Sequence, residues 1–255
     1  MKQTSSQELS QPLQSSVYAG HRVLAMFPFY NEGPKIARLA DKLQPGLVDK
    51  FVAVNDGSTD EGPDVLRQRG IEVLDQPRSG IGACIKRCVR YARENNYDIL
   101  VVMAGNNKDN PEEIPHLLAP ILEGRADYVQ GSRYLPGGSY PNTPLFRVVA
   151  IKLLSLIFSV YMRQRCTDLT NGFRAYRLNV FDDHRINIGQ DWLDDYEYEY
   201  YLHWKMYTLG YPVAEVPVSK TYPATKGVKY SKIKPITGWW RMLRPFVLLG
   251  LRIKK

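Results

Sequence analysis

The chain has 255 residues, of which 44% are hydrophobic, enough to bury one α/β domain with additional elements. Its three cysteines form neither an even-numbered disulfide framework nor a metal-spaced set, which is typical of a protein from a reducing compartment. The net charge of +8 is uneven. Residues 216–255 contain ten of the 34 Lys and Arg and no Asp or Glu, which leaves 24 basic and 26 acidic residues in a nearly neutral body.

The two ends of the chain differ from this body. Residues 1–20 are polar, rich in Ser and Gln and without a signal-peptide pattern, so we expect a disordered tail. The longest apolar stretches, Leu153–Met162 and Phe246–Leu251, are shorter than the ~20 residues that span a bilayer. We therefore expect a soluble or peripheral protein with one main domain over 21–225 and a basic amphipathic segment over 226–255.

Strand and helix patterns alternate through residue 130. Alternation of this kind predicts an α/β fold with a mostly parallel sheet and right-handed crossovers. The Gly and Pro punctuation places strands at 23–27, 51–54, 71–74, 98–103 and 126–130, and helices at 34–43, 63–68, 80–95 and 111–122.

The pattern changes after Gly131. The hydrophobic pattern of the later residues predicts helices at 145–162 and 194–209 and a strand at 211–218. The helix at 145–162 is apolar on most faces, so it is either a core helix or a membrane-facing element, and both interpretations stay open.

The basic segment near the carboxyl end contains Trp239, Trp240 and Phe246 between its cations. This combination predicts contact with an anionic membrane surface, because aromatic rings enter the headgroup boundary while Lys and Arg meet the lipid phosphates. Pro245 should kink a helix there, which favours a segment that lies flat. Nucleic acid is the alternative partner, but no recognition motif accompanies the charge, so we predict none.

Polar side chains follow the first two predicted strands, in Pro28-Phe-Tyr-Asn-Glu32 and Asn55-Asp-Gly-Ser-Thr-Asp60. Ligands of open α/β sheets bind at such carboxyl ends of strands. Pro28 and Tyr30 offer a flat surface for a base, and Glu32 and Asp56 offer carboxylates for ribose hydroxyls or base N–H groups. The alternative is that each carboxylate caps the helix that follows it.

The ordered pair of motifs resembles the opening motifs of family-2 glycosyltransferases, which have an A-type, Rossmann-like fold. The resemblance covers roughly residues 22–225 and is strongest to polyprenyl- and dolichyl-phosphate glycosyltransferases (dolichol-phosphate mannose synthase-like) without transmembrane domains. It implies that Glu32 contacts the ribose and Asp56 the base of a nucleotide-sugar. It also matches Gly80-Ile-Gly82-Ala83, with Arg78 where the family has Asn; small residues at a helix start let N–H groups approach an anion.

The fourth strand departs from the family. Its members normally end this strand in Asp-x-Asp, which holds a divalent ion against the donor's diphosphate. Here the triplet is Ala104-Gly105-Asn106, with Gly105 and Asn106 on the nucleotide side. Three interpretations stay open: Asn106 and Asp109 bind Mg²⁺ or Mn²⁺, Lys108 supplies the positive charge in place of the metal, or the protein is a degenerate, inactive enzyme.

Two later segments are similar to the acceptor side of the family, Gly131-Ser-Arg-Tyr134 and Asp168–Tyr176. The resemblance implies that Ser132, Arg133 and Arg174 bind the acceptor phosphate, a role that suits the planar, bidentate guanidinium. The alternative is that both arginines form surface ion pairs.

Four acids occur where many relatives have an acidic acceptor-side motif, namely Asp194, Asp195, Glu197 and Glu199. A hydroxyl acceptor needs one of them as general base, whereas a phosphate monoester is already ionised near pH 7. In the second case the acids orient arginines or sugar hydroxyls, or are solvated.

Together these features predict an inverting transferase that moves a hexosyl unit to a polyprenyl phosphate, as in cell-envelope glycan assembly, peripheral on the cytoplasmic face of a membrane. Arg133, Arg174 and Lys108 are the predicted catalytic residues. The alternatives are transfer to a saccharide hydroxyl and a non-catalytic nucleotide-sugar-binding protein.

Overall fold

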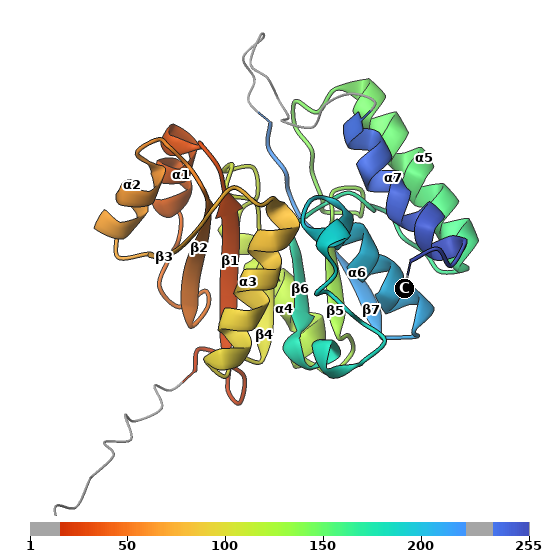
Figure 1. Ribbon diagram of the computed structural model, residues 1–255, viewed down its shortest axis with the longest axis horizontal. Helices are drawn as coiled ribbons and strands as arrows, with labels where there is room; N and C mark the ends of the chain where they lie inside the picture. Colours follow the sequence, from red (N-terminus) through yellow and green to blue (C-terminus); the bar gives the residue numbers. More distant parts are fainter. Residues whose placement is uncertain (1–15, 223–236, 255) are drawn as a thin grey trace, which may run out of the picture.

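A seven-stranded sheet forms the centre of the protein, with helices on both faces (Figure 1). The computed structural model describes residues 16–222 and 237–254. The strand order is β3-β2-β1-β4-β6-β5-β7. The strands are β1 (Val23–Phe29), β2 (Lys50–Asp56), β3 (Glu72–Gln76), β4 (Ile99–Val102), β5 (Tyr128–Ser132), β6 (Arg174–Arg177) and β7 (Val213–Pro217).

The predicted α/β class and mostly parallel sheet are confirmed. The prediction missed one strand, β6, which runs antiparallel between β4 and β5. Its four residues, Arg-Ala-Tyr-Arg, carry only two apolar side chains, which is too short a pattern to stand out. In the folded protein, however, Ala175 pairs with Val101 of β4 and Val129 of β5, so β6 joins the two parts of the sheet.

Alternation along β1 creates two cores. Val23, Ala25 and Phe27 belong to the core shared with α1, α2 and α4, whereas Leu24 and Met26 belong to the core shared with α3 and α6. The helices are α1 (Gly33–Ala40), α2 (Gly62–Gln68), α3 (Ile81–Glu94), α4 (Ile114–Leu122), α5 (Leu145–Met162), α6 (Glu197–Thr208) and α7 (Thr237–Gly250), and short 3₁₀ helices are η1 (Pro111–Glu113), η2 (Leu178–Asp182) and η3 (Asp191–Leu193).

Helices α5 and α7 lie side by side at one end of the molecule (Figure 1), where the rings of Phe158 and Phe246 are 5.3 Å apart. Only four α5 residues, Val148, Ile151, Ser155 and Phe158, are buried. The structure therefore favours the surface-facing interpretation over a core helix. By length and composition alone, α5 is a candidate membrane span among the described residues. The sequence did not predict this, because the apolar stretch that follows Lys152 has only ten residues. Arg147 and Lys152 interrupt the apolar pattern, but they do not interrupt the helix.

The two predicted terminal segments lie partly outside the described residues. Residues 1–15 and 226–236 are not described. In the remainder of the predicted tail, the Tyr18 hydroxyl donates a hydrogen bond to the Leu47 carbonyl at 3.0 Å. In the basic segment, Pro245 lies within α7, which packs on the domain through Phe246 and Leu249.

Candidate active site

The predicted nucleotide motifs meet where the strand order reverses, at the carboxyl ends of β1 and β4. Open α/β sheets bind ligands at such a switch point. Gly105 is pressed against the end of β1, since a Cβ there would lie 2.6 Å from the Pro28 carbonyl oxygen. The loops after β1 and β2 are joined as well, because the Thr59 N–H donates to Asn31 Oδ1 at 2.8 Å.

Asp56 and Tyr30 are connected by the side chain of Arg78. Its guanidinium lies 4.0 Å from the centroid of the Tyr30 ring and forms an ion pair with the buried Asp56 carboxylate. Asp56 also accepts hydrogen bonds from the N–H groups of Ser79 (2.8 Å) and Gly80. Ring, guanidinium and buried carboxylate thus form one continuous chain of contacts, although Arg78 replaces the Asn of the family pattern.

Glu32 is buried and paired with Lys35, with 2.6 Å between carboxylate oxygen and Nζ. It makes no side-chain cap for α1, and Asp56 makes none for α2, so the capping alternative does not describe this structure. The roles of Glu32 toward ribose and Asp56 toward a base stay predictions.

The small residues at the start of α3 lie against another segment of the protein. A Cβ on Gly82 would lie 1.9 Å from the Leu193 carbonyl oxygen, and the Ala83 N–H donates to the Asp194 carbonyl at 2.9 Å. The N–H of Gly80 is bonded to Asp56. These glycines therefore admit the protein's own segment 193–195, and their contact with a nucleotide stays a prediction.

Four cations from separate segments act on one another near the ends of β1 and β4. The pKa of Lys108 is lowered to about 8, by burial first and then by the charges of Lys220, Arg147 and Lys35. The Tyr222 ring has Lys108 Nζ 4.5 Å and Arg147 Cζ 5.8 Å from its centroid. We call Lys35, Lys108, Arg147 and Lys220 the cation cluster; only Lys108 was expected from the sequence, because the others are distant in the chain.

The candidate metal ligands do not make a divalent-metal site. Asp109 is 1% exposed, and its Oδ1 lies 2.5 Å from Lys220 Nζ while its Oδ2 accepts from the Ala104 N–H at 2.8 Å. Asn106 Oδ1 is buried without a hydrogen-bond partner in the part of the chain that is described, but it is a neutral oxygen. Within those same ranges no three His, Cys, Asp or Glu side chains are grouped for a metal. The donor set therefore does not fit Mg²⁺ or Mn²⁺ held by protein carboxylates.

The predicted acceptor arginines are buried rather than on the surface. Arg133 is 2% exposed and binds Asp168 through Nε and Nη2 at 2.6 and 2.7 Å. Arg174 is 3% exposed and donates to the carbonyls of Asn171 and Glu199, both at 2.8 Å. The surface ion-pair alternative is therefore wrong, while the contact of either arginine with a phosphate stays a prediction.

Ser132 lies beside these arginines, with its hydroxyl 2.6 Å from Thr167 Oγ1. The four acids of segment 194–199 mostly face basic partners. Asp194 pairs with Lys86, Asp195 with Arg241 and Glu197 with Arg244. Glu199 contacts the backbone instead, since a Cβ on Gly172 would lie 2.8 Å from its Oε1.

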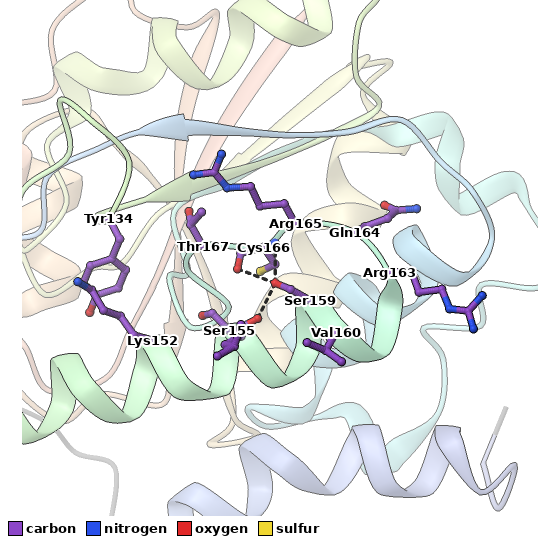
Figure 2. A pocket seen from close by; sticks show the side chains of 11 residues that line it. Tyr134, Lys152, Ser155, Ser159, Val160, Arg163, Gln164, Arg165, Cys166 and Thr167 are labelled. Carbon is purple, nitrogen blue, oxygen red and sulfur yellow. Dashed lines mark hydrogen bonds between the residues drawn. The ribbon is translucent and has the colours of Figure 1, made fainter.

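A cavity of about 540 Å³ lies between α5 and residues 163–167 (Figure 2). Tyr134 and Lys152 lie together at one end, with 5.4 Å from Nζ to the ring centroid, and Arg163 lies at the other (Figure 2). Its floor is fixed because the Cys166 N–H donates to Ser159 Oγ at 2.9 Å. Exposed apolar side chains of α5 and cations from three positions thus border the same space, next to the segments predicted for the acceptor.

Comparison with known proteins identifies the family. Residues 25–185 match the model of glycosyl transferase family 2. The chain belongs to this family. It is a nucleotide-sugar-dependent glycosyltransferase, as predicted.

The similar proteins of known activity include two bacterial enzymes. The polyprenol monophosphomannose synthase of Mycolicibacterium smegmatis is 27% identical over 81% of this chain and 80% of its own. The undecaprenyl-phosphate mannosyltransferase of Micrococcus luteus is 29% identical over 78% of this chain and 83% of its own. Among solved structures, glucosyl-3-phosphoglycerate synthase from Mycobacterium tuberculosis, in complex with Mn²⁺, uridine diphosphate and phosphoglyceric acid, superposes with a TM-score of 0.63 at 20% identity, covering 92% of this chain and 79% of that one. This likeness confirms the predicted A-type fold.

Proposed function

We propose that this family-2 glycosyltransferase moves a hexosyl unit from a nucleotide-sugar to a polyprenyl phosphate, with inversion, at the surface of a membrane. The observation that carries the proposal is the cation cluster around Lys108, which follows β4 at the switch point of the sheet. Both the diphosphate of the donor and the phosphate of such an acceptor are anions, and both need positive charge nearby. Two relatives, a polyprenol monophosphomannose synthase and an undecaprenyl-phosphate mannosyltransferase, support this acceptor class.

In the proposed reaction an acceptor phosphate oxygen attacks the anomeric carbon. The new carbon–oxygen bond forms as the bond to the donor's diphosphate breaks, and the electron pair leaves with the diphosphate. Attack from the opposite face inverts the configuration. No general base is required, because the phosphate is already ionised, which agrees with the pairing of Asp194, Asp195 and Glu197 with basic side chains.

Arg133 and Arg174 are proposed to serve the acceptor from a fixed position. Their hydrogen bonds to Asp168 and to the Glu199 carbonyl fix both side chains, which supports a role in orienting the acceptor before the reaction. For direct contact a phosphate has to reach the remaining N–H groups of Arg133, whose side chain also lies under the Tyr134 ring at 5.4 Å.

The exposed face of α5 supports the proposal that the reaction takes place at a membrane surface. Its solvent-facing side chains are large, apolar and more than half exposed; they are Leu145, Phe146, Val149, Leu153, Leu156, Ile157, Val160 and Tyr161. Trp240, near the start of α7, is more than half exposed as well. Patches of this kind are rare on soluble monomers. With Lys152, Arg163 and Arg165 bordering the adjacent cavity, the face suits an anionic cytoplasmic leaflet, where the acceptor's lipid enters along α5.

The test is a transfer assay with the full-length protein, polyprenyl phosphate in anionic vesicles, and uridine or guanosine diphosphate hexoses. We expect a glycosyl phosphoryl polyprenol of inverted anomeric configuration, read by mass spectrometry and NMR, and no product with the unphosphorylated polyprenol. Product on saccharides alone would favour the hydroxyl-acceptor alternative. Nucleotide binding without turnover on any donor would favour a non-catalytic binding protein.

A further inference from the structure

A leaving diphosphate needs positive charge nearby, which a divalent ion bound by Asp-x-Asp usually supplies in this family. In this chain two features oppose the binding of such an ion. Ala104 and Asn106 offer no carboxylate, and the nearby carboxylate that remains, Asp109, is neutralised by Lys220. A divalent ion would have to displace an ammonium group that is 2.5 Å from Asp109 Oδ1 and 3.2 Å from Asn171 Oδ1. The protein thus already holds a cation at the end of β4.

We propose that Lys108 and Lys220 bind the diphosphate of the donor as built-in cations, so that glycosyl transfer proceeds without a divalent metal ion. This inference rests on the proposed function, and it assigns the chemistry that stabilises the leaving group in that reaction.

Backbone contacts fix the position of both lysines. The Thr221 N–H donates to the Lys108 carbonyl at 3.0 Å, and Asp109 and Lys220 form a β-bridge. The Ser219 N–H donates to Glu113 Oε2 at 2.8 Å, which ties the same strand to η1. Cations held in this way cost little reorganisation when charge develops on a leaving group.

The charge balance of the cation cluster points to an anionic ligand. Among the described residues, Asp109 pairs with Lys220 and Glu32 with Lys35, while the charges of Lys220, Arg147 and Lys35 oppose the charge of the buried Lys108. Lys108 and Arg147 moreover share one face-on partner, the Tyr222 ring. Like charges held together repel each other unless an anion joins them, and a diphosphate at the β1–β4 switch point provides that anion.

The first measurement is calorimetric binding of uridine and guanosine diphosphate to the full-length protein in EDTA, then in Mg²⁺ or Mn²⁺. We expect binding of one nucleotide that is equally tight in all three buffers, and transfer rates that EDTA leaves unchanged. Nucleotide binding or turnover that disappears in EDTA and returns with either metal would overturn the inference. Metal-independent nucleotide binding without any lipid product would contradict the proposed function and leave this inference standing.

The second measurement assigns the lysines. Lys108→Gln and the double variant Lys220→Gln/Asp109→Asn, which leaves no unpaired buried charge, should each weaken nucleoside diphosphate binding by roughly tenfold to hundredfold, the loss expected for hydrogen bonds to a charged group. Two controls accompany these variants. Binding of the parent nucleoside, which is weaker, should not change, and neither should diphosphate binding by Lys42→Gln, which replaces an exposed lysine in the turn after α1. Variants that fold as judged by circular dichroism and still bind diphosphate as tightly as the parent protein would refute the assignment.

Discussion

The two halves of the sheet use charged side chains in different ways. On the β1–β4 side, Lys108 is largely buried, and the positive charges of Lys220, Arg147 and Lys35 act on it. On the β5–β6 side, Arg133 forms two side-chain hydrogen bonds to Asp168 and is buried with it. The first arrangement is costly without a ligand, whereas the second stabilises the fold only as an intact pair. Replacing residues in each half should therefore affect binding on one side and stability on the other.

Arg133→Met should give the largest effect, on stability. It leaves Asp168 buried without its ion-pair partner, which costs about 3–5 kcal/mol. Urea unfolding followed by fluorescence measures this loss. The matched control is Arg125→Met, whose pair with Glu123 is exposed and is worth about 1 kcal/mol or less. Equal losses in both variants would mean that Arg133 is not a structural residue.

Asp56→Ala should chiefly weaken nucleotide binding. The variant removes the carboxylate that holds Arg78 against Tyr30 and accepts the Ser79 N–H, and losing hydrogen bonds to a charged group costs about 1.5–3 kcal/mol each. Calorimetry with nucleoside diphosphates measures the effect. Asp64→Ala, on the exposed start of α2, is the control and should bind as the parent protein does. Unchanged affinity of the Asp56 variant would remove this residue from the pocket.

Diphosphate binding should also depend on pH. Since the pKa of Lys108 is about 8, the group is protonated below that pH and loses its charge above it. Burial lowers this pKa most, the charges of Lys220, Arg147 and Lys35 lower it further, and the charge of Asp109 raises it. Affinity should therefore fall as the pH rises from 7 to 9. Binding titrations across this range test the sign, and in Lys108→Gln the fall should be absent.

The smallest expected effect concerns the membrane face. Ile157→Glu, on the exposed side of α5, should reduce binding to anionic vesicles without changing the unfolding curve, because the side chain is 57% exposed. Val17→Glu, also exposed but distant in the chain, is the control. Vesicle sedimentation measures binding. Equal sedimentation of both variants would exclude this face of α5 as the membrane contact.

The difference between the halves also explains how far sequence alone could predict the structure. The strands and motifs around Tyr30 and Asp56 were predictable because each is a local pattern, an apolar run that ends in polar residues. Strand β6 and the partner of Arg133 were not, because pairing between residues 133 and 168 depends on the path of the chain through α5. The same holds for Lys220, which meets Asp109 only in the folded protein.

The tight fit at Gly82 connects parts of the enzyme that are far apart in the chain. Position 82 touches the carbonyl of Leu193, and the adjoining Asp195 grips Arg241 on the last helix. A methyl group added at position 82 would displace this segment and disturb the ion pair between Asp195 and Arg241. Substitution at this one glycine is therefore restricted by the packing of a segment that also holds the carboxyl-terminal helix.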